Sequence, residues 1–374
     1  MKNAVIVSCF DWYKARLKPV RDILAGKGYD VTVLIADFNH IKKEPIDNRS
    51  PECTYLHVPA YKKNLSIARM RSHLVFGKTV DQLLEEIKPE LIFCQVPPNN
   101  VSDYCRKYKK KHSGTILVLD IIDLWPESMP LGVVKKMLPA RIWGKWRDEA
   151  IKAADYTFTE CDLYQKELND VILRQKTETL YLFKEQSIEE KKLVQEIVEN
   201  RKSEEQTVKL AYLGSMNHII DIEGICNVIK RLQGQNISCE VYAIGDGEAR
   251  KSFEDAVKSL GCLTHFYGKV YDELEKIRLL APCDYALNMM KSDIRVGLTI
   301  KSIDYLSYGL PLINNIKGDT YRMVEEEHLG VNAEKLCLPL VSFDHKKICD
   351  YYESKFSVGS FQEKIEMCLN RFHL

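Results

Sequence analysis

The fold is decided by residues 239–248, CEVYAIGDGE, where a mostly apolar run meets two glycines that flank an acid. The run at 239–244 is typical of a strand that is buried on both faces. A helix is predicted at 248–260, and its first amide groups lack partners within the helix, which suits an anion. Glycine permits a tight turn and a close approach of the backbone to a ligand. A βα turn without a ligand would use the same residues, so both interpretations stay open.

The same alternation extends in both directions. In the carboxy-terminal half we predict strands at 208–213, 239–244, 263–267, 284–290 and 311–315, with helices at 223–232, 248–260, 272–280, 301–308 and 320–328. In the amino-terminal half we predict strands at 5–9, 31–36, 91–95, 115–121 and 156–160, with helices at 14–27, 68–87 and 101–112. Such alternation forms parallel sheets. The sequence therefore predicts the α/β class, with two Rossmann-like doubly wound domains that face each other across a cleft, where ligands bind beyond the strand ends.

The segment 184–207 separates the two halves. It is rich in Glu, Lys and Gln and has few apolar residues, so we predict a solvated, charged helix and linker. The amino-terminal domain is expected to span 1–183, and the carboxy-terminal domain 208–345. Residues 346–374 are expected to form terminal helices, of which the last is amphipathic and a candidate to dock back on the amino-terminal domain.

The composition is that of an ordinary globular protein. Of 374 residues, 45% are hydrophobic and 29% are charged, and 54 Lys and Arg against 53 Asp and Glu leave a net charge of +1. This balance does not indicate nucleic acid as a partner. The start lacks the features of a signal peptide, no apolar run is long enough to span a membrane, and the twelve cysteines have no regular spacing. We therefore expect a cytoplasmic protein with reduced thiols.

The segment 297–311, GLTIKSIDYLSYGLP, carries the chemistry of the second half. A turn rich in Gly and Thr opens a helix, so that backbone amides, the Thr299 and Ser302 hydroxyls and the Lys301 ammonium can converge on a diphosphate. Asp304, one turn further along, can accept hydrogen bonds from ribose hydroxyls. An amphipathic helix closed by Gly-Leu-Pro, without a ligand, is the alternative.

The order of short motifs in this half resembles the carboxy-terminal domain of glycosyltransferases with the GT-B fold. The GDG turn at 245–247 is followed by FYGKV at 266–270, DEL at 272–274 and CDYA at 283–286, and the resemblance covers most of residues 208–331. The segment 297–311 looks like the K-x-x-E-Y-x-x-x-G-x-P signature of retaining, family 4 bacterial polysaccharide glycosyltransferases, with Asp304 and Tyr305 in the Glu-Tyr positions.

That resemblance implies a nucleotide-sugar donor, with uridine diphosphate as the expected nucleotide. The donor-binding residues it implies are Gly214, Ser215, Gly245, Arg295, Thr299, Lys301, Asp304 and Tyr305. Lys301, helped by Arg295, would neutralise the leaving diphosphate. No cofactor is expected. No pair of carboxylates of the DxD type occurs at a predicted strand end, so no metal is expected either.

The sequence departs from the family at three positions. Val296 stands where many relatives have a first Glu that contacts the transferred sugar. Ser215 stands where an Arg is common, and Glu223 stands where a Lys is expected. The usual set of charged donor contacts is therefore incomplete.

The amino-terminal half contains VLDIIDLWPES at 118–128, which closely resembles the D-x-x-D-L-W-P-E-S motif of the same enzymes. A buried strand delivers Asp123 to the carboxyl edge of the sheet. Trp125 can pack on a sugar ring, and Glu127 can accept its hydroxyls. Asp123 or Glu127 would act as a general base or order the acceptor, and helix capping is the alternative.

A second acceptor-side motif is Phe10-Asp11-Trp12 followed by Arg16, which is similar to the F-D-W…R loop of these relatives. Asp11 is the second candidate for the base, and Trp12 and Arg16 are expected to contact the acceptor. Local packing of Trp12 and a helix cap at Asp11 are the alternatives.

Two stretches are basic in an otherwise neutral chain. Residues 53–80 and residues 128–147 contain no Asp or Glu but several Lys and Arg, and the second also contains Trp143 and Trp146. A basic aromatic helix lies readily at the surface of an anionic membrane. We therefore expect peripheral membrane contact through residues 133–147, with a solvated outer face as the alternative.

Together these features predict a glycosyltransferase that moves a sugar from a nucleotide-diphosphate donor to a hydroxyl of a surface glycan, with a glycan or a lipid-linked glycan as the expected acceptor. Lys301 would stabilise the leaving group, and Asp123 or Asp11 would serve the acceptor. A non-catalytic partner that has lost turnover and a nucleotide-sugar epimerase with the same two domains are the rivals.

Overall fold

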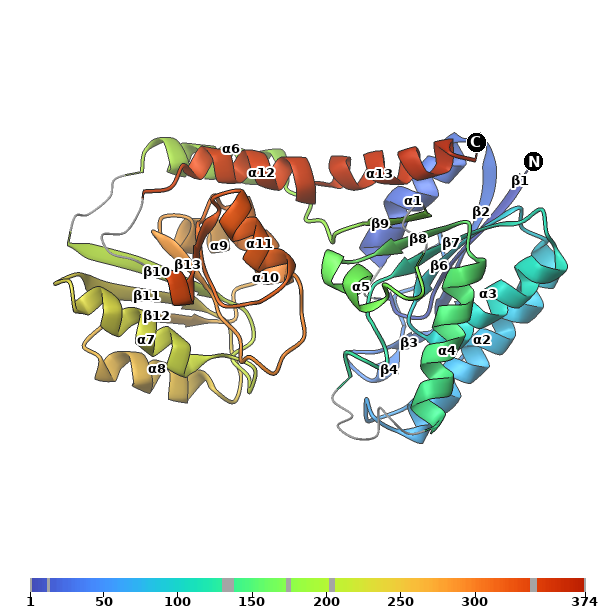
Figure 1. Cartoon of the computed structure of the whole chain (residues 1–374), viewed down its shortest axis with the longest axis horizontal. Coiled ribbons are helices and arrows are strands. Elements are labelled where there is room, and N and C mark those ends of the chain that lie inside the picture. The colour runs from blue at the N-terminus through green and yellow to red at the C-terminus, as the bar shows by residue number, and fades with distance from the viewer. Residues whose placement is uncertain are drawn as a thin grey trace. The chain divides into compact units, whose positions relative to one another are not determined.

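The computed structural model describes residues 2–11, 14–129, 138–172, 176–201, 206–336 and 342–372. The chain divides into two units. Unit 1 comprises Met1–Leu182 and Phe361–Leu374, and unit 2 comprises Phe183–Ser360. Each unit is built on a parallel sheet with helices packed against it (Figure 1). The predicted α/β class with two Rossmann-like domains is confirmed.

Unit 1 contains a seven-stranded sheet in the order β5-β2-β1-β6-β7-β8-β9, and all its neighbouring strands run parallel. Its central strands are buried on both faces, as their continuous apolar sequences require. The strands are β1 (Lys2–Ser8), β2 (Tyr29–Ala36), β5 (Thr54–Leu56), β6 (Leu91–Val96), β7 (Ile116–Ile121), β8 (Tyr156–Thr159) and β9 (Thr177–Thr179). A separate two-stranded hairpin joins β3 (Phe38–Asn39) and β4 (Glu44–Pro45).

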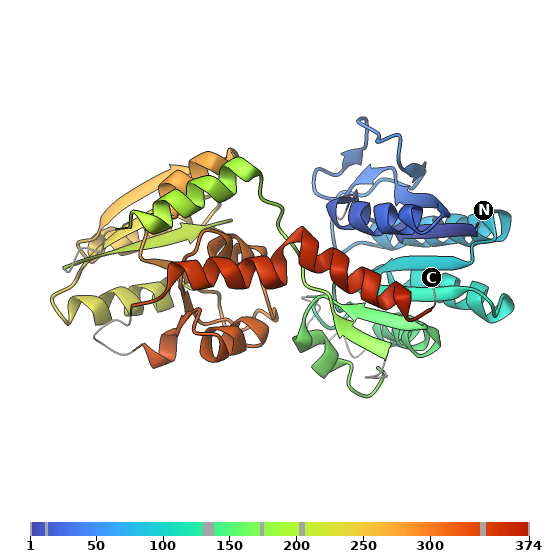
Figure 2. The ribbon, with the colours of Figure 1, turned by 90° about the horizontal axis from the view of Figure 1, so that it is seen from above.

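The helices of unit 1 cover both faces of its sheet. Helices α2, α3 and α4 lie on one face, and α1 and the last helix, α13, lie on the other (Figures 1 and 2). From Phe361 onward α13 belongs to unit 1, and Lys364 Nζ donates to the Thr179 carbonyl at 2.6 Å. The helices are α1 (Lys14–Gly26), α2 (Ile67–Ile87), α3 (Asn99–Lys111), α4 (Leu138–Ala153), α5 (Asp162–Glu167) and α13 (Val358–Asn370).

Unit 2 contains a six-stranded parallel sheet in the order β12-β11-β10-β13-β14-β15. Numbered along the unit this order is 3-2-1-4-5-6, which is that of dinucleotide-binding Rossmann domains. The strands are β10 (Thr207–Leu213), β11 (Ser238–Ile244), β12 (Leu263–Gly268), β13 (Tyr285–Asn288), β14 (Leu312–Asn314) and β15 (Gly330–Asn332).

Helices α7 and α8 cover one face of this sheet, and α9, α10 and α11 cover the other (Figure 1). The helices of unit 2 are α6 (Ile188–Glu199), α7 (Ile222–Gln233), α8 (Arg250–Ser259), α9 (Glu273–Leu280), α10 (Ile300–Ser307), α11 (Asp319–Glu326) and α12 (His345–Phe356), with a short 3₁₀ helix at Ala333–Lys335.

The segment expected to be a linker is in part an element of unit 2. Residues 188–199 form α6, which begins with a capping box between Ser187 and Glu190 and buries Val194. It packs beside α9 and α12. The charged side chains conceal this contact in the sequence because Val194 is the one fully buried residue of α6, with Leu193, Ile197 and Val198 half-buried beside it. Helix α12 likewise belongs to unit 2, so of the terminal helices only α13 joins unit 1.

The eleven cysteines within the described ranges are free thiols, and most of them are buried. None of the helices in those ranges combines the length and the apolar character needed to cross a bilayer.

Candidate active site

Both sheets reverse their strand order at one point, and such switch points open a crevice beyond the strand ends. In unit 2 the switch lies between β10 and β13, which pair in parallel. Gly214 and Ser215 follow β10 directly, and the start of α10 follows β13 after a loop. The sheet thus brings together residues that the sequence predicted for the donor, although they lie far apart along the chain.

Two glycines bring the loops after β10 and β11 into backbone contact. Gly214 and Gly245 have φ values of +124° and +142°. A Cβ on Gly245 would lie 1.9 Å from the Gly214 carbonyl oxygen, so a side chain cannot fit there. The two amides donate to the Ile244 and Gly268 carbonyls at 2.9 and 2.7 Å, which leaves neither for a phosphate. The glycines therefore create space at the switch point and do not act there as donors.

Lys301 occupies that space. A Cβ on Gly214 would meet its Cδ at 2.9 Å, so the ammonium reaches the switch point only because residue 214 is glycine. Lys301 Nζ lies 3.4 Å from Tyr212 Oη and 4.9 Å from the centroid of the Tyr212 ring. Within the described ranges no carboxylate pairs with it, and burial lowers the pKa of Lys301 to about 8. A partly desolvated ammonium without a counter-charge is unfavourable by itself and favours an anionic ligand.

The hydroxyls at the start of α10 serve the protein itself. Thr299 is the N-cap, and its Oγ1 accepts from the Ser302 amide at 3.1 Å. Ser302 Oγ lies 2.8 Å from Thr299 Oγ1 and donates to Asn288 Oδ1 at 3.2 Å. Capping accounts for Thr299 without a donor, which corrects the expectation that both hydroxyls converge on a diphosphate. With the Ser302 amide satisfied by the cap, the Ile300 and Lys301 amides of the first turn are those that lack an intrahelical partner.

Tyr305, expected to contact the donor, lies in the core of unit 2. It is fully buried, and its hydroxyl accepts from the Leu213 amide at 2.6 Å. Its role in the structure is to join α10 to the end of β10, and this corrects the expectation of direct contact.

Asp304 is held by a residue that the sequence did not indicate. Lys184 Nζ donates to Asp304 Oδ1 at 2.9 Å and to the Tyr308 hydroxyl at 3.2 Å, and it also pairs with Glu273. Burial raises the pKa of Asp304, and the ammonium of Lys184 opposes that shift. No local pattern marks Lys184, because it belongs to a segment crowded with charges.

The remaining donor-side positions lie in exposed loops or turns. Ser215 and Arg295 are exposed, and Val296 is half-buried beside Arg295. Glu223 is exposed in the first turn of α7. Positions 215 and 223, where the family has basic residues, therefore carry an exposed Ser and an exposed Glu in this chain.

In unit 1 the switch lies between β1 and β6. Asp11 follows β1, and its Oδ2 accepts from Asn39 Nδ2 at 3.2 Å. Asp11 Oδ1 is buried and has no hydrogen-bond partner within the described ranges. A buried carboxylate oxygen without a partner is rare and suits a residue that receives a proton from a ligand. Trp12, its expected neighbour in the acceptor site, lies outside the described residues.

Arg16 is a structural residue. It is 3% exposed, and its guanidinium pairs with Asp120 through two hydrogen bonds of 2.8 Å. It also donates to the carbonyls of Leu180 and Tyr181 at 2.7 and 2.9 Å. With its donors occupied inside unit 1, Arg16 cannot contact an acceptor, which corrects that expectation.

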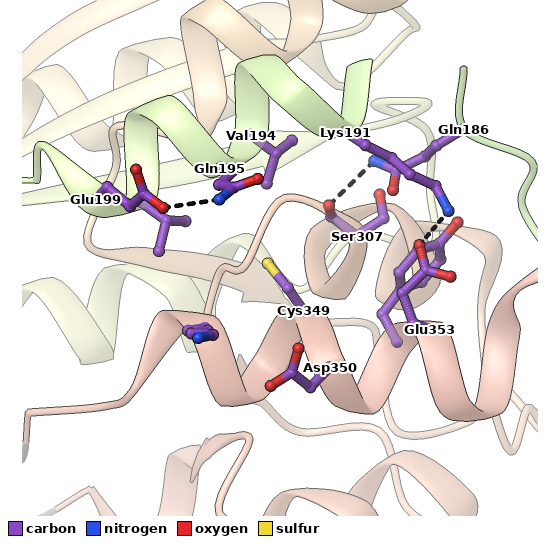
Figure 3. Close-up of a pocket in the computed structure, with 12 residues that line it drawn as sticks. Gln186, Lys191, Val194, Gln195, Glu199, Ser307, Cys349, Asp350 and Glu353 are labelled. Carbon is purple, nitrogen blue, oxygen red and sulfur yellow. Dashed lines mark hydrogen bonds and ion pairs between the residues drawn. The ribbon is translucent and has the colours of Figure 1, made fainter. Parts of the chain in front are cut away.

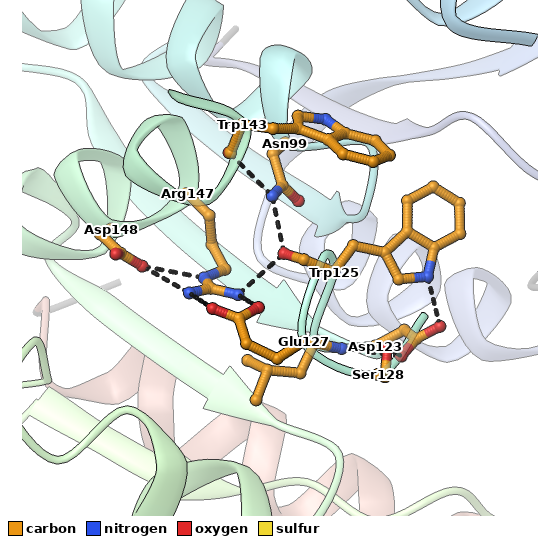
Figure 4. A network of polar contacts seen from close by, with 9 residues as sticks. Asn99, Asp123, Trp125, Glu127, Ser128, Trp143, Arg147 and Asp148 are labelled. Atoms are coloured by element: carbon orange, nitrogen blue, oxygen red, sulfur yellow. Dashed lines mark hydrogen bonds and ion pairs between the residues drawn. The ribbon is translucent and has the colours of Figure 1, made fainter. Parts of the chain in front are cut away.

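Asp123 organises the loop that follows β7 (Figure 4). Its oxygens accept from the Leu124 amide at 2.8 Å, from Trp125 Nε1 at 2.6 Å and from Ser128 Oγ at 2.5 Å. Burial raises the pKa of Asp123, although these donors favour its charged form. The carboxylate is thus occupied, whereas Asp11 Oδ1 has no hydrogen-bond partner within the described ranges.

Glu127 and Trp125 are also taken up by internal contacts (Figure 4). Glu127 receives two hydrogen bonds from Arg147, of 2.7 and 3.0 Å. Trp125 is 7% exposed, and His73 stacks on it with ring centroids 5.9 Å apart. Neither side chain is free to contact a sugar as expected. The sequence motif specifies a stable loop because each of its polar groups finds a partner within unit 1.

A cavity of about 260 Å³ lies between α6 and α12 in unit 2 (Figure 3). Lys191 pairs with Glu353 at 2.5 Å, and Gln195 donates to Glu199 at 2.8 Å. Gln186 donates to the Ser307 carbonyl at 3.1 Å. With these groups paired, the cavity lacks the uncompensated charge found at Lys301 and is not a candidate for the donor.

No protein-family model matches the sequence, and no curated protein matches it. Solved structures do resemble the whole chain. The lipopolysaccharide outer core galactosyltransferase WaaB superposes with a TM-score of 0.66 at 14% identity, covering 100% of both chains. Sucrose-phosphate synthase from Thermosynechococcus elongatus gives 0.65 at 11% identity, covering 100% of this chain and 99% of that one.

A third likeness is to UDP-GlcNAc 2-epimerase from Neisseria meningitidis, with a TM-score of 0.52 at 11% identity, covering 99% of this chain and 100% of that one. Identities this low establish the fold and not the activity. The chain has the GT-B fold.

Proposed function

We propose that the protein is a glycosyltransferase that moves a sugar from a nucleoside-diphosphate donor to a hydroxyl of a glycan. The observation that carries the proposal is the half-buried ammonium of Lys301 at the switch point of unit 2, which no carboxylate within the described ranges neutralises. A diphosphate there would supply the missing counter-charge. As the bond to the sugar breaks, negative charge grows on the diphosphate, so a fixed cation stabilises the transition state more than the ground state.

The donor would lie across the ends of β10, β11 and β13. The first amides of α10 and the Lys301 ammonium would hold the diphosphate. Asp304 Oδ2 would accept from the ribose, with Oδ1 fixed by Lys184. Ser215 and Arg295, both exposed, are proposed to border the donor. Uridine is the proposed base, and neither a metal nor a cofactor is part of the proposal.

The acceptor would be held by unit 1. Asp11, with its buried and unpartnered Oδ1, is the proposed group that orients or deprotonates the acceptor hydroxyl. Asp123 remains the second candidate. Transfer with retention, in the manner of the family 4 enzymes that the motifs resemble, would place less demand on a strong base.

The proposed setting is the assembly of a bacterial surface polysaccharide at the inner face of the cell membrane. Peripheral membrane contact through residues 133–147 is part of this proposal, although residues 133–137 lie outside the described chain. Helix α4, which begins at Leu138, provides the described part of that segment.

The test combines donor binding with turnover. We would titrate the protein with UDP and UDP-sugars by calorimetry and measure sugar transfer and donor hydrolysis. Lys301→Met should abolish UDP binding and transfer, whereas Lys291→Met, at an exposed lysine in the loop before α10, should leave both unchanged. Equal UDP affinity in the two variants would contradict the proposal.

The rivals give different results in the same assay. One rival is an epimerase, because the third structural likeness is to an enzyme of that kind. An epimerase would interconvert nucleotide sugars without an acceptor. A non-catalytic partner would bind UDP but neither hydrolyse nor transfer the sugar of any donor.

A further inference from the structure

The core of unit 1 contains a cation that its own residues do not neutralise. Arg69, on α2, is 5% exposed, and its guanidinium lies 4.5 Å from the Trp125 ring, 5.7 Å from Phe10 and 5.8 Å from Tyr61. One nitrogen donates to the Asn64 carbonyl at 3.1 Å, and Nε has no partner. Within the described ranges no carboxylate forms an ion pair with it. Aromatic faces stabilise a guanidinium but do not cancel its charge.

A second buried group beside it also lacks a partner. His73, one turn further along α2, is 4% exposed, and its Nε2 makes no hydrogen bond within the described ranges. Burial holds the pKa of His73 well below its usual value, and it lowers the pKa of the nearby His40 to about 3. Both imidazoles are therefore neutral near pH 7. Arg69 Nε is a buried donor and His73 Nε2 a buried ring nitrogen, and neither has a hydrogen-bond partner within the described ranges.

Arg69 and His73 line one cavity of about 180 Å³. The rest of its lining is largely apolar and comes from the start of α2, from Met129 and from the start of α4, where Pro139, Ala140 and Trp143 contribute. The starts of α2 and α4 thus lie side by side around the cavity.

Leu65 and Met70 line the cavity and are exposed, and other large apolar side chains are exposed on the same two helices. On and before α2, Ile67, Met70 and Leu74 follow one another at three- and four-residue spacing, and Leu138 and Ile142 continue the surface on α4. Met70 is 48% exposed and Leu138 is 68% exposed. We call Leu65, Ile67, Met70, Leu74, Leu138 and Ile142 the apolar surface. So many exposed large apolar side chains at one place mark an interaction site.

The charge around this surface has one sign. Residues 53–80 and 128–147, which supply both walls of the cavity, contain no Asp or Glu. Lys62 and Lys63 are exposed just before α2, and Arg141 and Lys145 lie on α4. The occupant must therefore combine an anionic group with an apolar body.

We infer that this cavity binds a lipid phosphate, with the phosphate beside Arg69 and His73 and the apolar chain along the apolar surface. A free anion would leave the apolar surface in water, and a neutral lipid would leave Arg69 unpaired. The inference rests on the proposed function in one respect, because the lipid phosphate would be the carrier of the acceptor glycan. Its binding is testable without any transfer assay.

The first experiment compares ligands on the whole protein by calorimetry. Hexyl, octyl and decyl phosphate should bind with affinity that rises about three- to fourfold for each methylene that becomes buried. Inorganic phosphate and octyl glucoside, which each carry half of the ligand, should bind at least tenfold more weakly than octyl phosphate. Equal binding of octyl phosphate and octyl glucoside would overturn the inference, as would the absence of any chain-length dependence.

The second experiment compares two arginines of α2. Arg69→Gln should lower the affinity for octyl phosphate about 10- to 100-fold, as expected for a lost hydrogen bond to a charged group. Arg71→Gln removes the same charge from an exposed position outside the cavity and should change the affinity less than threefold. Equal losses in the two variants would show general attraction by basic residues and contradict the site. Should Arg69→Gln not fold, Met70→Ser, at the rim, should reduce the chain-length dependence.

A vesicle experiment separates a lipid surface from a single bound lipid. The protein should sediment with phosphatidylcholine vesicles only when phosphatidic acid is added, and octyl phosphate should compete for it. Sedimentation that octyl phosphate does not reduce would contradict occupation of the cavity. Titration of the same samples with UDP distinguishes the two proposals. If the protein binds UDP but not octyl phosphate, only the lipid phosphate site is wrong. If it binds octyl phosphate but not UDP, only the proposed donor site is wrong.

Discussion

The Tyr305 hydroxyl accepts a hydrogen bond of 2.6 Å from the amide of Leu213, so α10, at whose start the donor is proposed to bind, is joined to the end of the first strand of unit 2. The two residues lie 92 positions apart in the sequence. The contact is fully buried, and it fixes the distance between the loop at Gly214 and the start of α10. Four predictions follow from contacts of this kind.

Tyr305→Phe should destabilise the protein and weaken the binding of UDP. The Leu213 amide would lose its partner inside the core, which costs about 1–3 kcal/mol in the free energy of unfolding. Urea denaturation and a UDP titration would measure both effects. Tyr271→Phe is the matched control, because Tyr271 is 84% exposed. Indistinguishable stabilities of the two variants would show that the hydrogen bond contributes nothing.

UDP affinity should depend on pH through Lys301. Burial lowers the pKa of Lys301 from 10.5 to about 8, so the free protein loses this proton near pH 8 while the unfolded chain keeps it to about pH 10.5. Since the unfolded state binds more protons in this range, the free energy of unfolding should rise with pH between about 8 and 10.5. UDP needs the charged form, so its affinity should be constant below about pH 8 and fall above it by up to tenfold per pH unit.

Calorimetric titrations between pH 7 and 9.5 would test that dependence. Lys301→Met should remove the dependence of stability on pH that is due to this group. A UDP affinity that stays constant up to pH 9.5 in the unaltered protein would contradict the assigned role of the ammonium.

Arg16→Met should lower the free energy of unfolding, and it should not change the affinity for the acceptor directly. The substitution leaves the fully buried Asp120 without its partner, which costs about 3–5 kcal/mol. Lys18→Met on the same helix breaks an ion pair with Asp22 whose side chains are 66% and 38% exposed, and it should cost less than about 1 kcal/mol. Urea denaturation measures the difference. If Arg16→Met has normal stability and a raised KM for the acceptor, Arg16 contacts the acceptor and the structural role assigned here is wrong.

The two candidate bases should respond differently to amide substitution. Asp123→Asn would place an amide against the donors of Leu124, Trp125 or Ser128 and should lower the free energy of unfolding by about 1–3 kcal/mol. Asp11→Asn should leave stability within about 0.5 kcal/mol but lower kcat at least 100-fold, the range for loss of a general base. A loss of kcat on Asp123→Asn alone, at normal stability, would exchange the two roles.

The sequence by itself determined the architecture. Runs such as 239–244 and 115–121 are largely apolar, each interrupted by one acid, and a sheet covered on both faces buries such strands. It did not reveal β5 and β9, because edge strands of three residues carry no periodic signal, nor the packing of α6, whose apolar contact is a single buried valine.

The sequence also located the position of Lys301, because a turn rich in Gly and Thr before a helix is a local feature. Whether a polar residue is free or occupied was decided only by the tertiary structure. Arg16 meets Asp120 at a separation of 104 residues, and Lys184 meets Asp304 at a separation of 120. Trp125 and Glu127 belong to a motif that predicts ligand contacts, but in the fold both side chains make internal contacts. Arg69 belongs to no motif, and within the described ranges no carboxylate pairs with it. The physical reason is that strand order and packing determine which charges meet, and a buried charge left without a partner indicates where a ligand binds.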